Sequence, residues 1–403
     1  MTQIKQGYKQ TEIGVLPEDW NVAPMSELTN LMTNGFVGTA KTHYTDSRDG
    51  VIYIQGYNVE ENSFNYKGIK KVTPAFHLKN SKSCLRTGDV LMVQTGDVGL
   101  TTVVPPELEG SNCHALIINR FKSNHCSHFF SYYLNSNLGR SRLKELETGT
   151  TMKHINVGDL LHFLIPLPPT LAEQEKIASV LSDMDDYIVS LEGLIEKKRN
   201  IKQGAMQKLL NPFDDNGEIK QGWQEKCLGD VLKIRHGKSQ HEVTDSMGIY
   251  PILATGGCIG FTNKFLYNKP SVLIGRKGTI DKPQYIDKPF WTIDTLFYSE
   301  INKDNHAKYL YYKFCLIDWY SYNEASGVPS LNAKSIEAIE FFTPSYNQQK
   351  SIAQTLSDMD TEIDALTIKH TKAKDLKQGM MQKLLTGQIR LVKPSTIQQE
   401  IAA

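Results

Sequence analysis

The sequence predicts an α+β protein in which two related globular domains are separated by a pair of long antiparallel coiled-coil helices. The main observation is an internal repeat: residues 173–210 align with residues 348–385 without a gap, at 19 identities in 38 positions. Both copies have apolar residues at helical spacing, whereas the segments before them have the short alternating runs of strands. Because each copy closes one half of the chain, a pseudo-two-fold arrangement is the simplest.

The two repeats are predicted to be uninterrupted helices of about 57 Å, much longer than the average globular helix. Neither copy contains a proline. Thr170 and Glu173 form a potential capping box at the first start, and Pro212 and Gly387 follow the two ends. The apolar positions predicted to form the seam between the helices are Ile177, Leu181, Met184, Ile188, Leu191, Ile352, Leu356, Met359, Ile363 and Leu366.

Two features of the repeats concern their polar residues. The seam reaches Lys198, Lys202, His370 and Lys377, where we expect the helices to splay or to admit another protein. Both copies also contain the sequence LSDMD. Its aspartates are expected to point outward, away from the seam; they are Asp183, Asp185, Asp358 and Asp360.

The predicted organisation has five parts. They are an N-terminal segment with the first globular domain (1–169), the first long helix (170–212), the second globular domain (213–344), the second long helix (345–388) and a C-terminal tail (389–403). The globular domains share a pattern in which an apolar strand precedes a glycine turn, with Val90–Met92 aligned to Val272–Ile274 and Gly96 to Gly278. Their sequences differ far more than the helices do, which suggests that they carry specificity.

Composition restricts the class of protein. The chain has 403 residues, a formal charge of +1 and 40% hydrophobic residues, as in soluble globular proteins. It shows neither a membrane-length apolar run nor a signal-peptide pattern, so a cytoplasmic location is expected. The six cysteines contain no CxxC pair, which argues against a disulfide framework or a zinc ribbon. Cys113, His114, His125, Cys126 and His128 are close in sequence, but their spacing matches no common site, and no metal is predicted.

Charge is unevenly distributed. Residues 34–86 contain eight Lys or Arg against four Asp or Glu, and residues 226–288 contain ten against five. These basic stretches are consistent with contacts to nucleic acid, although ordinary solvated surfaces have similar charge.

No catalytic residues are predicted. The sequence NPFD at Asn211 lacks the second proline of an amino-methyltransferase motif, and HGKS at His236–Ser239 lacks the first glycine of a phosphate-binding loop, where Leu232 stands. No carboxylate cluster with the lysine arrangement of restriction nucleases is present in the sequence.

With these features the chain resembles the specificity subunit of type I restriction–modification systems. The resemblance is carried by IPLPPTLAEQEKIASVLSDMD, by IKQGAMQKLL with its second version, and by the opening YKQTEIGVLPEDW, and it extends from about residue 7 to 390. It is specific in the helices and weak in the globular domains. The second copy departs from the first at its start, with Asn347-Gln348-Gln349 where the first has Ala172-Glu173-Gln174.

The resemblance implies a non-catalytic, DNA-reading subunit. Each globular domain, a target-recognition domain, would read one half of a bipartite double-stranded target, while the helices set the spacing and dock two adenine-N6 methyltransferase subunits. Further motor-nuclease subunits would cut the DNA. The cofactors S-adenosylmethionine, ATP and magnesium would belong to those partners, and none to this chain.

Candidate DNA-binding residues come from the basic stretches and from polar residues on turns, because phosphate contacts need cations and base contacts need side-chain donors and acceptors. The loop IGRKGT is the strongest candidate, since two glycines allow close approach around two cations. The full set is Lys41, Lys67, Lys70, Lys71, Arg86 and Gln94 in the first domain, and Arg235, His236, Lys238, Ser239, Asn263, Lys264, Arg276 and Lys277 in the second.

Three other functions are weighed against this one. A free-standing DNA-binding regulator would need the same domains but no second docking surface on the helices. A coiled-coil adaptor would bind protein without DNA, and a self-contained methyltransferase would act alone.

Overall fold

The computed structural model describes residues 4–150 and 153–392, and it divides into two compact units. Unit 1 comprises the chain up to Glu192 and from Lys369 onward, and unit 2 comprises Gly193–Ile368. Each unit contains one globular domain and part of both long helices, α6 (Leu171–Leu209) and α10 (Tyr346–Leu384). Of the predicted C-terminal tail, residues 393–403 lie outside the described residues. None of the described helices combines the length and apolar character needed to cross a membrane.

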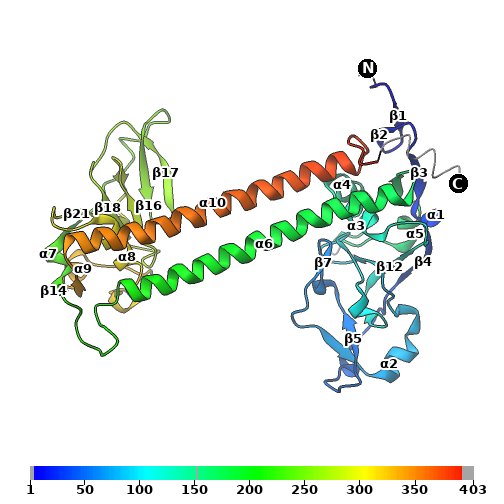
Figure 1. Cartoon of the computed structure of the whole chain (residues 1–403), viewed down its shortest axis with the longest axis horizontal. Helices are drawn as coiled ribbons and strands as arrows, with labels where there is room; N and C mark the ends of the chain where they lie inside the picture. Colours follow the sequence, from blue (N-terminus) through cyan, green and yellow to red (C-terminus); the bar gives the residue numbers. More distant parts are fainter. Residues whose placement is uncertain (1–3, 151–152, 393–403) are drawn as a thin grey trace. The chain divides into compact units, whose positions relative to one another are not determined.

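Unit 1 contains a four-stranded sheet and a three-stranded sheet (Figure 1). The first has the order β10 (Thr101–Val103), β9 (Val90–Val93), β12 (Leu116–Phe121), β4 (Thr29–Asn34), and the second β11 (Asn112–Cys113), β5 (Val51–Ile54), β8 (Lys70–Val72). The remaining strands pair as β1 (Tyr8–Thr11) with β2 (Gly14–Pro17), β3 (Asn21–Pro24) with β13 (Leu164–Leu167), and β6 (Val59–Glu60) with β7 (Ser63–Phe64). Its shorter helices are α1 (Met25–Leu28), α2 (Pro74–Lys79), α3 (Ser127–Asn135), α4 (Asn137–Lys144) and α5 (Val157–Leu161).

Unit 2 repeats this plan. Its four-stranded sheet has the order β15 (Leu232–Arg235), β21 (Leu296–Ile301), β18 (Ser271–Gly275), β19 (Gln284–Ile286), and its three-stranded sheet β17 (Gly257–Thr262), β16 (Tyr250–Ala254), β20 (Trp291–Thr292). Strand β14 (Gln224–Cys227) pairs with β22 (Glu340–Thr343). The shorter helices are α7 (Leu228–Val231), α8 (Ala307–Phe314) and α9 (Ala333–Glu337).

The two domains have the same topology. In each four-stranded sheet, the strand that comes first in the chain pairs with the strand that comes last: β4 with β12, and β15 with β21. All neighbouring strands in these sheets are antiparallel. In each three-stranded sheet the central strand, β5 or β16, pairs in parallel on one side and antiparallel on the other. The predicted α+β class, with two related domains and long antiparallel helices, is confirmed.

Some apolar residues of the long helices belong to the domain cores, and others lie along the predicted seam. Ile177 and Leu181 of α6 join Met381 and Leu384 of α10 in the core of the unit 1 domain, and in unit 2 Leu356 of α10 belongs to the domain core. Of the other predicted seam residues, Ile188, Leu191 and Ile363 are buried, whereas Met184, Ile352, Met359 and Leu366 are half-buried. The helices are therefore held partly through the domains that they support.

The polar stretch of the seam is closed by ion pairs, so the expected splaying is not observed. In unit 2, Lys198 Nζ lies 2.6 Å from Glu362 Oε1 and Lys202 pairs with Asp360.

In unit 1, His370 Nε2 lies 2.8 Å from Glu192 Oε1, and Lys377 Nζ lies 2.7 Å from Asp185 Oδ1. The residue numbers of the partners decrease on one helix as they increase on the other, so the helix segments in each unit are antiparallel.

Two of the LSDMD aspartates point inward, contrary to the expectation for these residues. In unit 1, the Tyr132 hydroxyl on α3 donates a hydrogen bond of 2.8 Å to Asp185, which also pairs with Lys377. In unit 2, the Tyr312 hydroxyl on α8 donates one of 2.6 Å to Asp360. The aspartates on the solvent side, Asp183 and Asp358, are exposed as expected. The inward aspartates find partners on the domain and on the opposite helix, which the sequence pattern alone does not show.

We predict that Asp185→Ala destabilises unit 1 by about 2–4 kcal/mol, because Lys377 would keep only Glu61 as an acidic partner while 9% exposed. The exposed Asp183→Ala provides the control and should change the stability by at most about 0.5 kcal/mol. Urea denaturation of the full chain measures both. Equal effects of the two substitutions would show that the inward aspartate has no structural role.

Candidate nucleic-acid interface

In unit 2, four loops meet at one end of the four-stranded sheet. They are residues 236–239 after β15, 276–278 after β18, 293–295 between β20 and β21, and 324–330 before α9. Backbone contacts join them: Lys238 N–H donates to Thr292 O at 2.8 Å, and Arg276 N–H donates to Thr295 O at 2.8 Å. Lys277 forms a β-bridge with Ser330. We call these residues the loop cluster of unit 2.

Unit 1 contains an equivalent loop cluster, formed by residues 35–38, 94–96, 113–115, 148–150 and 153–155. Phe36 N–H donates to Cys113 O at 3.0 Å, as Lys238 does to Thr292 in unit 2. Thr95 forms a bridge with His154, in the position of the bridge between Lys277 and Ser330. Loops that gather on a rigid scaffold are a common location for binding residues.

A glycine allows the close approach of two loops in each cluster. A Cβ atom on Gly35 would lie 2.8 Å from the carbonyl oxygen of Cys113, and one on Gly237 would lie 2.0 Å from the carbonyl oxygen of Ile293. Both distances are too short for any side chain, so the backbone positions of these loops depend on glycine.

Six of the sequence-predicted residues fall in or beside the loop clusters. Gln94 is half-buried in the cluster of unit 1. The cluster of unit 2 has five exposed candidates, which are His236, Lys238, Ser239, Arg276 and Lys277. The ring of His236 packs edge-on against Phe297 at 4.9 Å, so part of its surface is used for packing.

The other candidates in unit 2 lie elsewhere or have internal partners. Arg235, at the end of β15, is paired with Glu300 at 2.9 Å. Asn263 donates a hydrogen bond of 2.6 Å to Asp245, and Lys264 follows it beyond the end of β17. These residues are not brought together with Arg276 by the contacts of the loop cluster.

In unit 1, most of the predicted cations belong to the smaller lobe around β5 and β8. Lys70 and Lys71 lie on β8, Lys67 lies in the preceding turn, and Lys41 begins a short 3-10 helix (Lys41–His43). Arg86 precedes β9, whereas Gln94 follows it, so the two lie at opposite ends of that strand.

Electrostatics distinguish the two loop clusters. In unit 2, Lys238, Arg276 and Lys277 are exposed, and the described loops of the cluster contain two acidic residues, Asp294 and Glu324. In unit 1, burial lowers the pKa of His114, so its ring is neutral at pH 7, and its Nδ1 lies 3.1 Å from the Tyr53 hydroxyl. The described loops of the unit 1 cluster contain one Lys or Arg, the exposed Lys153, whereas those of unit 2 contain Lys238, Arg276 and Lys277.

The sequence reasoning missed the fourth loop of each cluster as a site. In unit 1, Lys153 and His154 lie on it, and in unit 2 Ser330 does. The available signal was the glycine-bearing loop that precedes the last strand of each domain, ETGTTMKHIN and ASGVPSLN. Residues 151 and 152 of the first loop lie outside the described residues.

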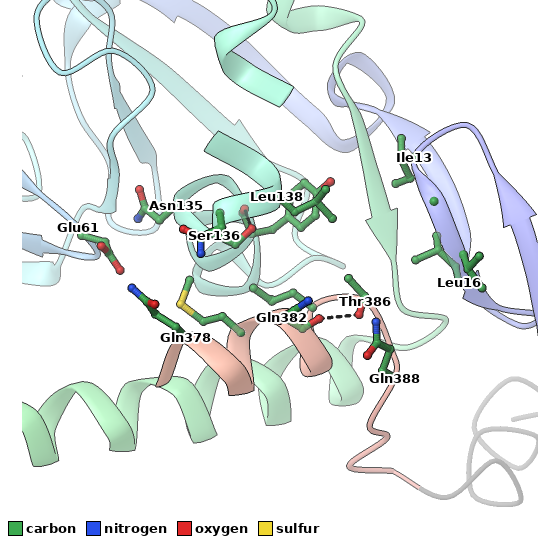
Figure 2. Close-up of a pocket in the computed structure, with 16 residues that line it drawn as sticks. Ile13, Leu16, Glu61, Asn135, Ser136, Leu138, Gln378, Gln382, Thr386 and Gln388 are labelled. Atoms are coloured by element: carbon green, nitrogen blue, oxygen red, sulfur yellow. Dashed lines mark hydrogen bonds between the residues drawn. The ribbon is translucent and has the colours of Figure 1, made fainter. Parts of the chain in front are cut away.

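A pocket of about 460 Å³ in unit 1 offers no catalytic arrangement. Figure 2 shows Gln378 and Gln382 of α10 opposite Asn135, Ser136 and Leu138. Its one carboxylate, that of Glu61, is paired with Lys377 at 3.0 Å. Among the residues that the structure describes, no group of three or more His, Cys, Asp or Glu is placed to hold a metal ion.

Comparison with known proteins identifies the family. Residues 17–203 and 220–377 match the type I restriction modification DNA specificity domain. The chain is 26% identical over 423 residues to a putative type I restriction enzyme MjaX specificity subunit of Methanocaldococcus jannaschii, covering 96% of this chain and 97% of the relative. It is 23% identical to the MjaIX specificity subunit of the same organism, over 95% and 96% of the two chains.

A solved structure supports the fold. The type I restriction-modification S subunit of M. genitalium superimposes with a TM-score of 0.64 at 18% identity, covering 95% of this chain and 97% of that chain. Both domains and both long helices are thus included in the match.

We predict that Gly237→Ala destabilises unit 2 by about 2 kcal/mol or more, because the new methyl group would overlap the Ile293 carbonyl and force the loops apart. Gly256→Ala is the matched control, since a Cβ atom there would meet nothing within 4 Å. Thermal unfolding of the two variants compares them. A Gly237→Ala protein as stable as the control would mean that the close loop approach is not required.

Proposed function

Because the chain belongs to the family of type I restriction–modification DNA specificity subunits, we propose that its two domains read the two halves of a bipartite double-stranded DNA target. The observation that carries this function is the pair of loop clusters. They have the same backbone contacts and different side chains, as expected for two readers of different half-sites. In this proposal the chain recognises DNA, and partner subunits methylate and cut it.

The loop clusters are proposed to face the bases, and the remaining basic residues to contact phosphates. Arg276, Lys277 and Lys238 are exposed and lie on loops joined by backbone bonds, so they can approach a groove without unfolding the domain. Lys70 and Lys71, on the smaller lobe of unit 1, suit phosphate contacts, which supply affinity without sequence information.

The long helices are proposed to set the spacing between the half-sites. Each has 39 residues and is therefore about 58 Å long, which exceeds the roughly 34–36 Å of one DNA turn. The ion pairs within each unit resist sliding of one helix along the other.

The outer faces of the helices are proposed to dock two methyltransferase subunits. Several positions are alike in both copies and at least partly exposed, and four of them lie along one line of each helix. In α6 they are Lys197, Ile201, Gly204 and Lys208, and in α10 Lys372, Leu376, Gly379 and Lys383. Their spacing of four, three and four residues places each set on one face of its helix, and we call each set a docking stripe.

The partners of this proposal supply the chemistry. Two adenine-N6 methyltransferase subunits would bind S-adenosylmethionine, and motor-nuclease subunits would bind ATP and magnesium. A free-standing regulator would not need a duplicated exposed stripe, and an adaptor without DNA would not need two loop clusters. The two features together favour a specificity subunit over either.

We predict that methylation mapping in cells with and without this gene reveals one bipartite motif that depends on it.

Removing seven residues from each helix, 190–196 and 366–372, should shorten the spacer by about three base pairs, because seven helical residues span about 10 Å and one base pair about 3.4 Å. The half-sites themselves should not change. Because the deletion also removes Lys372 of a docking stripe, the spacing is read by selecting duplexes from a DNA library with the purified chain. A shortened protein that selects the original spacing would disprove the role of the helices in spacing.

We predict that Ile201→Asp or Leu376→Asp reduces the bound methyltransferase from two copies to one, and that the double variant binds none. Both side chains are exposed, at 48% and 56%, and a carboxylate there opposes burial by a partner. Val189→Asp is the control: Val189 is 65% exposed, but the repeat has Asp364 in its place.

The measurement is the mass of the complex purified after co-expression with the methyltransferase gene adjacent to this one. If the control variant loses a copy as readily as Ile201→Asp does, the docking stripes are not the binding surface.

A further inference from the structure

Gln94 and Arg276 occupy the same position in the two domains. In unit 1, Leu116 pairs with Val93, and in unit 2 Leu296 pairs with Gly275. These pairs are equivalent, because Cys113 and Thr292 accept the equivalent loop bonds a few residues earlier. The next residue after each strand is therefore Gln94 in one domain and Arg276 in the other.

The local contacts of the two residues also correspond. The carbonyl of Gln94 accepts a hydrogen bond from Ile155 N–H at 3.4 Å, and that of Arg276 accepts one from Leu331 N–H at 2.9 Å. The following residues, Thr95 and Lys277, form the equivalent bridges. The backbone is thus equivalent at this position in the two domains, whereas the side chain is that of Gln94 in one and Arg276 in the other.

The side chain of Gln94 is oriented by its own loop cluster. Its Nε2 donates a hydrogen bond of 3.2 Å to the carbonyl of Ile155. This uses one of the two amide N–H groups and leaves the other, together with Oε1, without a partner among the described residues. One donor beside one acceptor is the pattern that pairs with N7 and N6 of adenine in the major groove.

The side chain of Arg276 is oriented in a similar way. Its Nη1 donates a hydrogen bond of 3.3 Å to the carbonyl of Asp294. The edge formed by Nε and Nη2 makes no hydrogen bond within the described part of the chain, and the residue is exposed. Two parallel donors match O6 and N7 of guanine.

From these contacts we propose that Gln94 and Arg276 determine one base each at the matching position of the two half-sites, Gln94 selecting adenine and Arg276 selecting guanine. This inference rests on the proposed function, since it requires both domains to read DNA. It assigns the difference between the half-sites at this position to one side chain per domain.

The test is an exchange of the two side chains. The full chain, Gln94→Arg and Arg276→Gln are each used to select duplexes from a DNA library that has two randomised segments separated by spacers of several lengths. Each substitution keeps a donor for the neighbouring carbonyl, of Ile155 or Asp294. Lys277→Gln serves as the control for loss of charge beside Arg276.

Gln94→Arg should change one adenine to guanine in the half-site of unit 1, and Arg276→Gln should change the matching guanine to adenine in the half-site of unit 2. The preference at that position should reverse by roughly 5- to 150-fold, the usual discrimination of a bidentate contact. Lys277→Gln should bind more weakly and keep guanine at the position that Arg276 selects. Unchanged selection at the other positions of the altered half-site shows that the substituted domain is folded.

Two results would overturn the inference. If both variants select the motif of the unaltered chain, or lose the preference at that position without the exchange, the base assignment is wrong while the reading of a bipartite target stands. If the unaltered chain enriches no bipartite motif, the proposed function itself fails.

Discussion

The junction of a tyrosine, an aspartate and a lysine holds each domain to both long helices. In unit 1 the tyrosine comes from the domain helix α3, the aspartate from α6 and the lysine from α10, as Tyr132, Asp185 and Lys377. In unit 2 the same three roles fall to residues of α8, α10 and α6. Because three elements meet at one carboxylate, the junction fixes both the helix register and the position of the domain on the helices within each unit.

The protonation states of this junction suit its role. Burial, and then the charge of Asp185, raise the pKa of Tyr132 far above the physiological range, so its hydroxyl remains a donor. Burial alone would lower the pKa of Lys377, but its hydrogen bond to Asp185 and the charges of Glu61 and Asp185 raise it overall. The ammonium also lies 5.8 Å from the centre of the Tyr132 ring. The charged lysine is therefore matched by partners on several sides, which a partly buried ion requires.

The long helices could be predicted from the sequence because their apolar period continues over nearly forty residues without a proline. The direction of Asp185 and Asp360 could not, because their partners Tyr132 and Tyr312 lie in domains whose sequences have diverged. The alignment of Val90–Met92 with Val272–Ile274 agrees with the strand register, so Gln94 of unit 1 is aligned with Arg276 of unit 2. Which loops surround these two residues depends on backbone contacts between segments far apart in the chain, and no local pattern reports them.

In the loop clusters, the backbone arrangement and the exposed side chains are independent of each other, because backbone bonds hold the loops together. The loop clusters are joined through backbone N–H and carbonyl groups, such as Phe36 to Cys113 and Lys238 to Thr292. These bonds do not depend on side-chain identity, so the exposed side chains can change without loss of the backbone arrangement. Gly35 and Gly237 are the exceptions, because the loop approach leaves no room for a side chain. The junctions between the domains and the long helices depend instead on specific side chains. The two repeats are identical at those junction residues, Asp185 with Asp360 and Lys202 with Lys377.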